Sequence, residues 1–557
     1  MFPDVLKFVK FGEQYTKIKS VKVNISLVLE YIKNRLLLKK LENTPIIENN
    51  NINIAQNDTR FRSDDGTFTN LQNPYIGTSG QPFGRYIPII NNYELYDPDP
   101  STVADVFFTR YREKYVPGAN LFVASWIQFM IHDWFNHVLD NSKCLALKPE
   151  MKVGATVFYQ DTYTLNENSH FWDGSQIYKD HLRKKDGSGH LLLNDNYIPI
   201  KNNTENTGFN KNMWFGLALL HLLFIKEHNY ICDRLKEKYN KMSDDELYGT
   251  SRLIVCGLIA KIHTVEWTKT ILQADVTSTG QDTFYYGVFG KKIRKFISKF
   301  IDFSKFKIPF SDILLGAPKG PIKDDNVNFS IVEEFTSVYK MHSLLPDSIT
   351  LHSLKNTDKE ILYLKDTLFY KSKNINTTYN SSDLMYSIGK SPVCSLDLNN
   401  FPHFLRNLQI PNHSNIDLAI SDILRDRERN VPRYNDFRRG LGLSTKKFED
   451  ITTDNTILEN LIKIYDNDVE KIDLMVGTHL EEKMPNCIFG ETIYTVFILQ
   501  TFRRIYNDRF YTTNYNATYY TQFGIDHIDG TTFKTLLLRH YPELNDSVGE
   551  NGFLLFN

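Results

Sequence analysis

Apolar residues recur every three or four positions over long stretches of this chain, which is the spacing of helices with a buried face. Runs in which apolar and polar residues alternate, as in strands, are short and few. No internal repeat of solenoid length is present. The pattern predicts helices over residues 101–116, 120–139, 213–239, 244–273, 331–343, 417–427, 455–464 and 490–507. We therefore expect a mainly α protein with few short strands.

The N-terminal region has a pattern of its own, because lysine and arginine outnumber acidic residues over positions 1–44. Its apolar residues follow helical spacing at Ile25, Val28, Leu29, Ile32 and Leu36. Such basic amphipathic helices can lie in a membrane interface, or they can pack on the protein's own core with a solvated basic edge. Residues 45–59 are rich in asparagine and predict a linker, which leaves 60–557 as the main folded region.

Composition narrows the class of protein. The 557 residues carry a formal net charge of -1, which excludes a global electrostatic case for nucleic-acid binding. The five cysteines are scattered without a Cys-x-x-Cys pair, which indicates a reducing compartment and no structural zinc. No stretch of about 18 uninterrupted apolar residues is present, and the N-terminus lacks a signal-peptide pattern. We expect an intracellular protein, peripheral on a membrane or lipid surface, that is not secreted.

Tyr339 and His342 are the first candidates for chemistry. If residues 331–343 are helical up to Pro346, side chains three apart share one face, with Cβ atoms roughly 5–6 Å apart. An imidazole can hold a metal or a haem iron, and a neighbouring phenol can lose an electron and a proton. The same spacing also occurs by chance in purely structural helices.

Gln128 and His132 lie one helical turn apart and share a face, where both could handle a small polar ligand. Asp133 points about 100° away round the helix and would serve a different neighbour. A buried structural histidine is one alternative. A His-Asp pair on a helix is also used by metal-dependent phosphohydrolases, which need further ligands from nearby helices.

Residues 169–175 present oxygen atoms on one side of an extended chain. Alternate positions there are Ser169, Phe171, Asp173 and Ser175. Two hydroxyls, one carboxylate and the backbone carbonyls form an all-oxygen set that suits Ca²⁺. A second carboxylate is expected, and without one an Asp-Gly turn explains the segment.

Three further stretches carry polar or charged groups. His263 and Thr268 are five residues apart, about 140° round a helix, so periodicity gives no reason to unite them. Residues 425–439 are dense in arginine and could bind carboxylates or propionates, with interleaved aromatic residues arguing against a simple solvated run. In residues 502–510, a buried Arg509 would need an anionic partner.

In this order, these stretches resemble the haem peroxidase and cyclooxygenase superfamily, and within it the fatty-acid α-dioxygenases known from plants. The similarity can be followed from about residue 60 to about residue 545, which makes chance an inadequate explanation. It is carried by the segments 126–134, 172–175, 226–229, 259–264, 339–347 and 431–435. The resemblance implies a haem peroxidase/cyclooxygenase-like helical catalytic domain over residues 60–557.

The resemblance also implies a role for each matching residue. It makes His342 the proximal ligand of a haem b iron, Asn435 the partner of its other ring nitrogen, His132 the distal histidine helped by Gln128, and Tyr339 the radical tyrosine. Asp133 becomes the second carboxylate of the Ca²⁺ site, although the family usually has Thr where this chain has Ser169. Arg429 and Arg433 become candidates for the haem propionates. His263, Thr268 and Arg509 become the groups that bind a substrate carboxylate, with Arg503 and Arg504 as neighbouring alternatives to Arg509.

The activity implied is oxygenation of long-chain fatty acids at the α-carbon by O2, through a tyrosyl radical, to 2-hydroperoxy acids. A hydroperoxide would activate the enzyme. Two related activities stay open: a haem peroxidase acting on small reductants, and a cyclooxygenase-like enzyme acting at mid-chain. A membrane-associated scaffold without catalysis is opposed by the retention of both histidines and the tyrosine. Chain-length preference, the fate of the hydroperoxide, the membrane and the oligomeric state do not follow from the sequence.

Overall fold

The computed structural model of the chain describes residues 44–48, 59–89, 93–194, 197–273, 275–287, 290–297, 316, 318, 328–355, 357 and 359–557. The predicted N-terminal helices lie outside these residues. Of the predicted linker, residues 45–48 and 59 are described, and Ile47 exchanges two hydrogen bonds with the side chain of Gln81, at 2.9 and 2.7 Å. That part of the linker is therefore fixed to the folded region.

Helices make up most of the described structure. In the first half of the chain they are α3 Pro100–Phe108, α4 Phe122–Trp134, α5 Ser175–Tyr178, α6 Phe215–Lys238, α7 Asp244–Ile262, the π-helical turn η1 His263–Trp267, α8 Thr268–Ile271, α9 Asp275–Tyr286 and α10 Gly290–Ile297. The second half contains α12 Glu333–Val338, α13 Ser372–Thr378, α14 Ser381–Lys390, α15 His403–Arg406, α16 Leu418–Glu428, α17 Tyr434–Gly440, α18 Phe448–Ile451, α19 Asn455–Ile464, α20 Leu474–Leu480, α21 Glu491–Tyr506, α22 Ala517–Gly530 and α23 Phe533–His540. Short 3₁₀ turns are η3 His342–Leu344, η4 Leu364–Thr367, η5 Phe369–Lys371, η6 Val469–Lys471 and η7 Pro542–Leu544.

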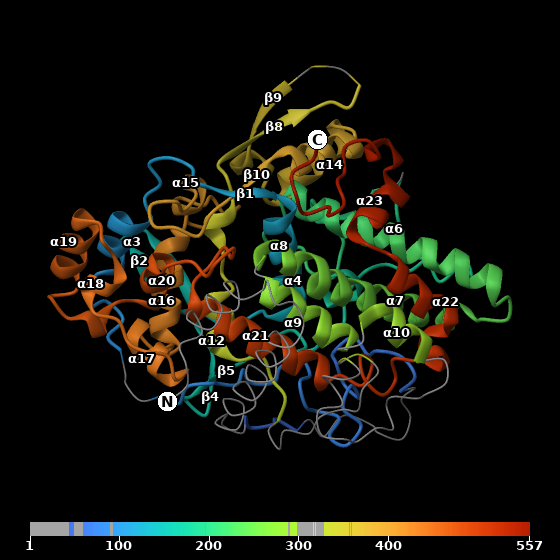
Figure 1. The fold of residues 1–557 in the computed structure, drawn as a ribbon, viewed down its shortest axis with the longest axis horizontal. Coiled ribbons are helices and arrows are strands. Elements are labelled where there is room, and N and C mark those ends of the chain that lie inside the picture. Colours follow the sequence, from blue (N-terminus) through green and yellow to red (C-terminus); the bar gives the residue numbers. More distant parts are fainter. Residues whose placement is uncertain are drawn as a thin grey trace.

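The strands are short and pair two by two, all antiparallel, within the described residues. The pairs are β1 Tyr115–Asn120 with β10 Pro392–Cys394, β2 Leu139–Lys148 with β3 Met151–Thr156, β4 Phe158–Tyr159 with β5 Tyr163–Thr164, β6 Ile200–Lys201 with β7 Thr204–Glu205, and β8 Ser348–His352 with β9 Lys359–Tyr363. The β8–β9 hairpin projects from the top of the molecule (Figure 1). The prediction of a mainly α fold with few short strands is confirmed.

Three long helices form the centre of the fold. α6 packs against both α4 and α7, and α7 packs against α22. α4 is buried on nearly every side because its sequence is apolar round the whole circumference. The helices α16 to α20 gather on the left in Figure 1, and α22 and α23 lie on the right. α4 therefore places its few polar side chains inside the protein.

Most predicted helices are present, with three differences. The helix predicted over 101–116 ends at Phe108, and the one predicted over 244–273 is interrupted by the π turn η1. The helix predicted over 331–343 ends at Val338. Among the helices of eight or more residues, α9, α10, α14, α22 and α23 lie outside the predicted ranges. Element ends are set by tertiary contacts more than by local pattern.

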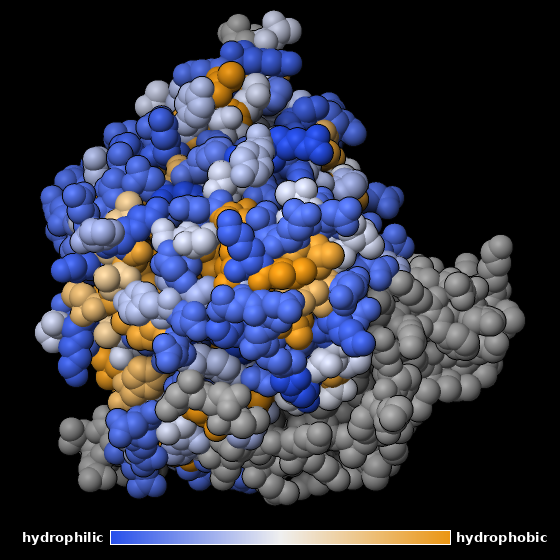
Figure 2. Space-filling view, turned by 90° about the vertical axis from the view of Figure 1, so that its left-hand side faces the viewer, coloured by the Kyte–Doolittle hydropathy of each residue, from blue (hydrophilic) through white to orange (hydrophobic). Residues whose placement is uncertain are grey.

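The surface offers no single apolar face in the view of Figure 2, where hydrophobic side chains form separate patches among hydrophilic ones. Among the described residues, no helix combines the length and the apolar character that crossing a bilayer requires.

Candidate active site

Gln128 and His132 on α4 face one cavity of about 300 Å³, which confirms that they share a helical face. His132 Nε2 lies 2.9 Å from Asn212 Oδ1, and Gln128 Oε1 accepts a hydrogen bond of 2.8 Å from Trp214 Nε1. Burial lowers the pKa of His132 to about 3, so the imidazole is neutral at physiological pH. Because Asn212 Oδ1 accepts a hydrogen bond, Nε2 carries the ring proton, and Nδ1 is the nitrogen of His132 that can accept a proton.

His342 lines the same cavity, which is otherwise mainly apolar. The prediction that Tyr339 and His342 share a helical face was wrong. α12 ends at Val338, Met341 has φ -103° and ψ 47°, and His342 begins a separate 3₁₀ turn. His342 lines the cavity, whereas Tyr339 is buried among aromatic rings. The tertiary contacts of Lys340 and His342 with α16 accompany this departure from helical geometry.

The partner of His342 is Asp422, not Asn435. His342 Nδ1 lies 2.7 Å from Asp422 Oδ2. Asn435 instead donates to the carbonyl oxygen of Lys446 and accepts from its backbone N–H, both at 2.9 Å. Its amide is thereby fixed to a loop, so the predicted pairing of Asn435 with His342 is corrected.

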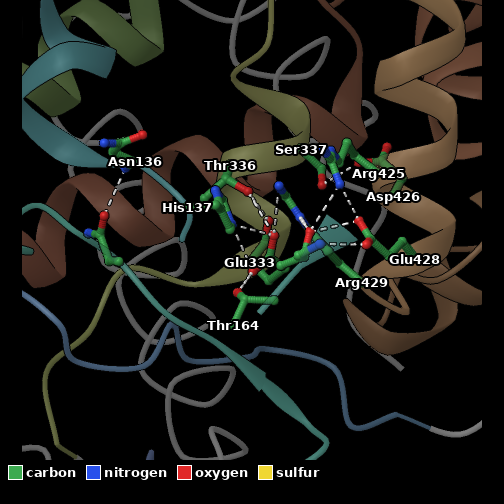
Figure 3. Close-up of polar contacts among 12 residues, drawn as sticks. Asn136, His137, Thr164, Glu333, Thr336, Ser337, Arg425, Asp426, Glu428 and Arg429 are labelled. Carbon is green, nitrogen blue, oxygen red and sulfur yellow. Dashed lines mark hydrogen bonds and ion pairs between the residues drawn. The ribbon is translucent and has the colours of Figure 1, made fainter. Parts of the chain in front are cut away.

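Arg429 and Arg433 form ion pairs with acidic side chains, and neither residue lines the cavity. Arg429 pairs with Glu333 at 3.4 Å and donates to Thr156 Oγ1 at 3.2 Å (Figure 3). Arg433 forms an ion pair with Asp473. A buried guanidinium needs an anion, and each of these has one within the protein. Their predicted role at the propionates is therefore not supported.

Tyr339 is packed among buried aromatic rings. Its ring stacks on Phe335 and Phe497, with centroid distances of 4.9 and 6.1 Å, and lies 5.3 Å from Trp134. Burial raises the pKa of the phenol well above its ordinary value, so the hydroxyl keeps its proton. That hydroxyl has no hydrogen-bond partner among the described residues. A buried hydroxyl without a partner is uncommon, and it marks a position where a ligand can interact.

The π turn η1 brings His263 and Thr268 together, although α-helical periodicity gave no reason to expect it. The backbone N–H of Thr268 donates to the carbonyl oxygen of His263, and the Thr268 hydroxyl donates to the same atom at 2.7 Å. The His263 ring lies against Trp134 and Trp172 and accepts at Nδ1 from Trp126 Nε1 at 3.1 Å. Single π-helical turns occur often at functional sites. His263 and Tyr339 thus contact the same tryptophan, Trp134.

The guanidinium beside the aromatic rings around Tyr339 belongs to Arg504, not to Arg509. Arg504 Cζ lies 3.8 Å from the centroid of the Trp134 ring and 5.4 Å from that of Trp172. Its three nitrogen atoms are buried and find no hydrogen-bond partner among the described residues. Arg509, in contrast, donates to the backbone carbonyl groups of Phe68 and Thr59. Arg504 is therefore the cation that can receive an anionic ligand beside Tyr339.

Four of the predicted oxygen ligands, on Asp133, Ser169, Asp173 and Ser175, lie close together in the structure. Ser175 donates from its backbone N–H to Asp133 Oδ1 at 2.7 Å and to Asp173 Oδ1 at 3.0 Å, and Ser169 Oγ donates to Asp173 Oδ2 at 2.5 Å. Burial and the Asp173 charge raise the pKa of Asp133 well above its ordinary value. Asp133 Oδ2 is buried without a hydrogen-bond partner among the described residues. Two buried carboxylates this close favour a bound cation.

The chain matches known proteins over most of its length. Residues 61–155 and 141–553 match the model of the family described as Animal haem peroxidase. The chain belongs to the animal haem peroxidase family. Alpha-dioxygenase PIOX of Nicotiana tabacum is 36% identical to it over 540 residues, covering 88% of this chain and 81% of the relative. Alpha-dioxygenase 2 of Arabidopsis thaliana is 34% identical over 534 residues, covering 87% and 82%.

Solved structures of the same kind superpose closely on this family member. Fatty acid alpha-dioxygenase of Arabidopsis thaliana has a TM-score of 0.87 at 30% identity, with 99% of this chain and 92% of the other covered. A Tyr-to-Phe variant of the Oryza sativa fatty acid alpha-dioxygenase, solved with palmitic acid, has a TM-score of 0.88 at 31% identity, with 99% and 96% covered. As a member of the animal haem peroxidase family with this fold, the chain is an oxidoreductase whose cofactor is haem.

Proposed function

We propose that this protein is a fatty-acid α-dioxygenase, which adds O2 to the α-carbon of a long-chain fatty acid and gives a 2-hydroperoxy acid. The observation that carries the proposal is the pair formed by Tyr339 and Arg504. Both have buried polar atoms without hydrogen-bond partners among the described residues, and both contact Trp134. A phenol that can lose a hydrogen atom thus lies near a cation that can hold a carboxylate.

The cavity between His132 and His342 fits haem. Both imidazoles line it, the rest of its lining is mostly apolar, and His132 Nδ1 is buried without a partner among the described residues. These are the features of a haem pocket with a proximal and a distal histidine. Haem bound through His342 would supply the oxidising equivalent, drawn from an activating hydroperoxide, that removes an electron and a proton from Tyr339.

Two lysines that could pair with the haem propionates line an adjoining cavity of about 690 Å³, and, unlike the ion pairs of the buried arginines, the pair of Lys371 with Asp366, at 3.7 Å, is exposed to solvent. The two cavities share lining residues, among them Leu368, Phe369 and Phe404. Lys365 and Lys371 line the larger one, which reaches the surface beside the exposed Tyr363. We assign the pairing with the haem propionates to these lysines instead of to Arg429 and Arg433, because an exposed ammonium group pairs with a propionate without the cost of burial.

Tyr339 would carry out the hydrogen transfers. Its phenoxyl radical takes a hydrogen atom from the α-carbon, which restores the phenol and leaves a carbon radical. O2 adds to that carbon, and the resulting peroxyl radical takes a hydrogen atom back from the phenol. The product is the 2-hydroperoxy acid, and the phenoxyl radical is regenerated.

Arg504, with His263, would determine which carbon reacts, while the Thr268 hydroxyl donates to the His263 carbonyl oxygen and so stabilises the π turn. A guanidinium binds a carboxylate through two parallel hydrogen bonds, which fixes the position of the adjacent α-carbon. Holding the reacting atoms in place in this way is a large part of catalysis. The anchor explains attack at the α-carbon rather than at mid-chain.

Two further parts of the proposal rest on the same reasoning. The cluster of Asp133, Ser169, the Phe171 carbonyl, Asp173 and Ser175 would hold Ca²⁺ and fix α4 relative to the loop 169–175. The described residues contain no group of three His, Cys, Asp or Glu side chains that could hold a metal, so neutral oxygens would complete the coordination. Residues 1–44 would associate with a membrane or lipid surface, from which the fatty acid is taken.

The test is oxygen consumption by the haem-loaded protein with palmitic acid, followed by identification of the product. We expect a Soret band and 2-hydroperoxypalmitic acid. Tyr339→Phe should keep the Soret band and lose oxygen uptake. Tyr178→Phe, which changes a buried phenol 3.1 Å from His228, is the matched control and should keep both.

Other results would favour other functions. Peroxidase turnover without fatty-acid-dependent oxygen uptake would favour a peroxidase of small reductants. A product oxygenated at mid-chain would favour a cyclooxygenase-like reaction. Full activity of Tyr339→Phe would refute the radical role of this tyrosine.

A further inference from the structure

Asp422 on α16 is one of several charged groups that surround the segment 337–342. Besides its contact of 2.7 Å with His342 Nδ1, its other oxygen lies 3.9 Å from Lys340 Nζ. Lys340 Nζ is also 3.7 Å from Asp426, which accepts a hydrogen bond of 2.7 Å from Ser337 Oγ. The ring nitrogen of His342 thus faces an anion whose neighbouring lysine is shared with a second carboxylate, and on which the more distant Arg429 also acts.

The charged network continues from α16 to the start of α12. Arg429, at the end of α16, pairs with Glu333, which also contacts His137 Nε2 at 2.9 Å and the hydroxyl of Thr164 (Figure 3). Arg425 and Glu428 pair within α16 at 2.6 Å. α16 therefore holds both ends of the segment that carries Tyr339 and His342.

A carboxylate and a neutral amide have different effects on a ligand imidazole. Either can accept the Nδ1 proton and leave Nε2 free to bind a metal. Only the carboxylate adds a full negative charge beside the ring, which makes the imidazole a stronger electron donor. A stronger donor stabilises the ferric state of a bound iron over the ferrous state.

We propose that Asp422 is a positioning residue that fixes the tautomer of His342 and, by its negative charge, lowers the reduction potential of the haem iron, with Lys340 partly offsetting that charge. The inference rests on the proposed binding of haem through His342 and goes beyond it, because it assigns the electronic control of the ligand to α16. Asn435, which is neutral and bonded to Lys446, has no part in it.

The test is the midpoint potential of the haem-loaded full-length protein, measured by spectroelectrochemical titration. Asp422→Asn should raise the midpoint potential by about 59 mV or more. For one electron, this shift corresponds to a tenfold decrease in the preference for ferric over ferrous iron. Asp422→Glu, which restores the carboxylate, should return the potential toward the wild-type value. Lys340→Met should lower it, because the anion loses its cation.

The control variant is Asn435→Ala, which should leave the potential unchanged even if it lowers the melting temperature. An unchanged potential in Asp422→Asn with haem bound would overturn the inference, as would a shift in Asn435→Ala equal to that in Asp422→Asn. If Asp422→Asn does not fold, the opposite shift in Lys340→Met decides the question, and a rise or no change there would overturn the inference.

The outcomes also separate this inference from the proposed function. A wild-type protein that binds no haem would overturn both. A wild-type protein that oxygenates palmitic acid, combined with unshifted potentials in both variants, would overturn only the role of Asp422.

Discussion

Replacing Arg504 by Met is the sharpest test of the substrate site, because affinity and stability should respond differently. The side chain is 2% exposed, and its guanidinium makes no hydrogen bond to any described residue. Burial lowers the pKa of Arg504 below its ordinary range, while Asp133 and Tyr339 act in the opposite sense. The buried guanidinium of Arg504 therefore lowers the stability of the folded state, as is expected of a residue that binds a ligand.

The expected loss of affinity follows from the two hydrogen bonds that a guanidinium makes to a carboxylate. A hydrogen bond to a charged group contributes about 1.5–3 kcal/mol, so two contribute at least about 3 kcal/mol. Arg504→Met should therefore raise the Kd for palmitic acid about 100-fold. The free energy of unfolding should change by less than about 1.5 kcal/mol with Ca²⁺ in the buffer, because an apolar side chain of similar length replaces an unbonded cation.

The assay uses the Tyr339→Phe background, so that palmitic acid binds without being consumed. Calorimetric titration gives the Kd, and urea unfolding gives the stability. Arg509→Met is the matched control, because its guanidinium donates at 2.8 Å to the carbonyl oxygen of Phe68, which is buried. It should lose about 1–3 kcal/mol of stability and keep the Kd.

The reasoning is refuted if the two variants exchange these effects. If the Kd for palmitic acid were unchanged in Arg504→Met and raised in Arg509→Met, Arg509 rather than Arg504 would be the residue that binds the substrate carboxylate. A large loss of stability in Arg504→Met with an unchanged Kd would make Arg504 a structural residue.

Three further predictions concern the cofactor, the metal and acid stability. Changing Lys365 and Lys371 together to Met should raise the Kd of the apoprotein for haem and weaken the salt dependence of that Kd, as measured by Soret titration. Lys373→Met, outside the cavity lining, is the control, and an equal effect in this variant would contradict the assignment. Removing Ca²⁺ with a chelator should lower the free energy of unfolding, because Asp133 and Asp173 would then lie buried beside each other without a cation; urea unfolding with and without Ca²⁺ tests this, and an unchanged midpoint would contradict the Ca²⁺ site. Burial strongly lowers the pKa of eight histidines in the folded state, among them His221 and His263, so the unfolded chain, with histidine pKa near 6.5, binds more protons. Stability should be full above about pH 6.5 and fall progressively toward pH 4 to 3, and urea midpoints that do not change between pH 7 and pH 4.5 would argue against it. The pKa is lowered to about 3 for His132, His170 and His228 and to about 4 for His137, His181 and His479.

The sequence by itself determined what depends on short-range geometry. Gln128 and His132 share a cavity because residues four apart on a helix always share a face. Asp173 meets Ser169 and Ser175 because these residues lie within a few positions of it. The mainly α class also followed from local periodicity alone.

The resemblance to a family added what no spacing could supply. It united segments far apart in the chain and assigned Asp133 to the oxygen cluster, where the structure places it within 2.7 Å of the Ser175 backbone nitrogen. It did not distinguish residues of the same type in one stretch. Arg509 was preferred to Arg504 because sequence does not reveal which arginine already has partners.

Only the tertiary structure decided which groups are already occupied. Asp422 is 80 residues from His342 in sequence, yet it reaches the ring, while the expected Asn435 is bonded to Lys446. Arg504 contacts Trp134 from the far end of the chain, and a single π turn aligns His263 with Thr268. Local pattern fixes the face on which a side chain lies, but the partner of a buried polar group depends on competition among all the groups that the fold brings near it.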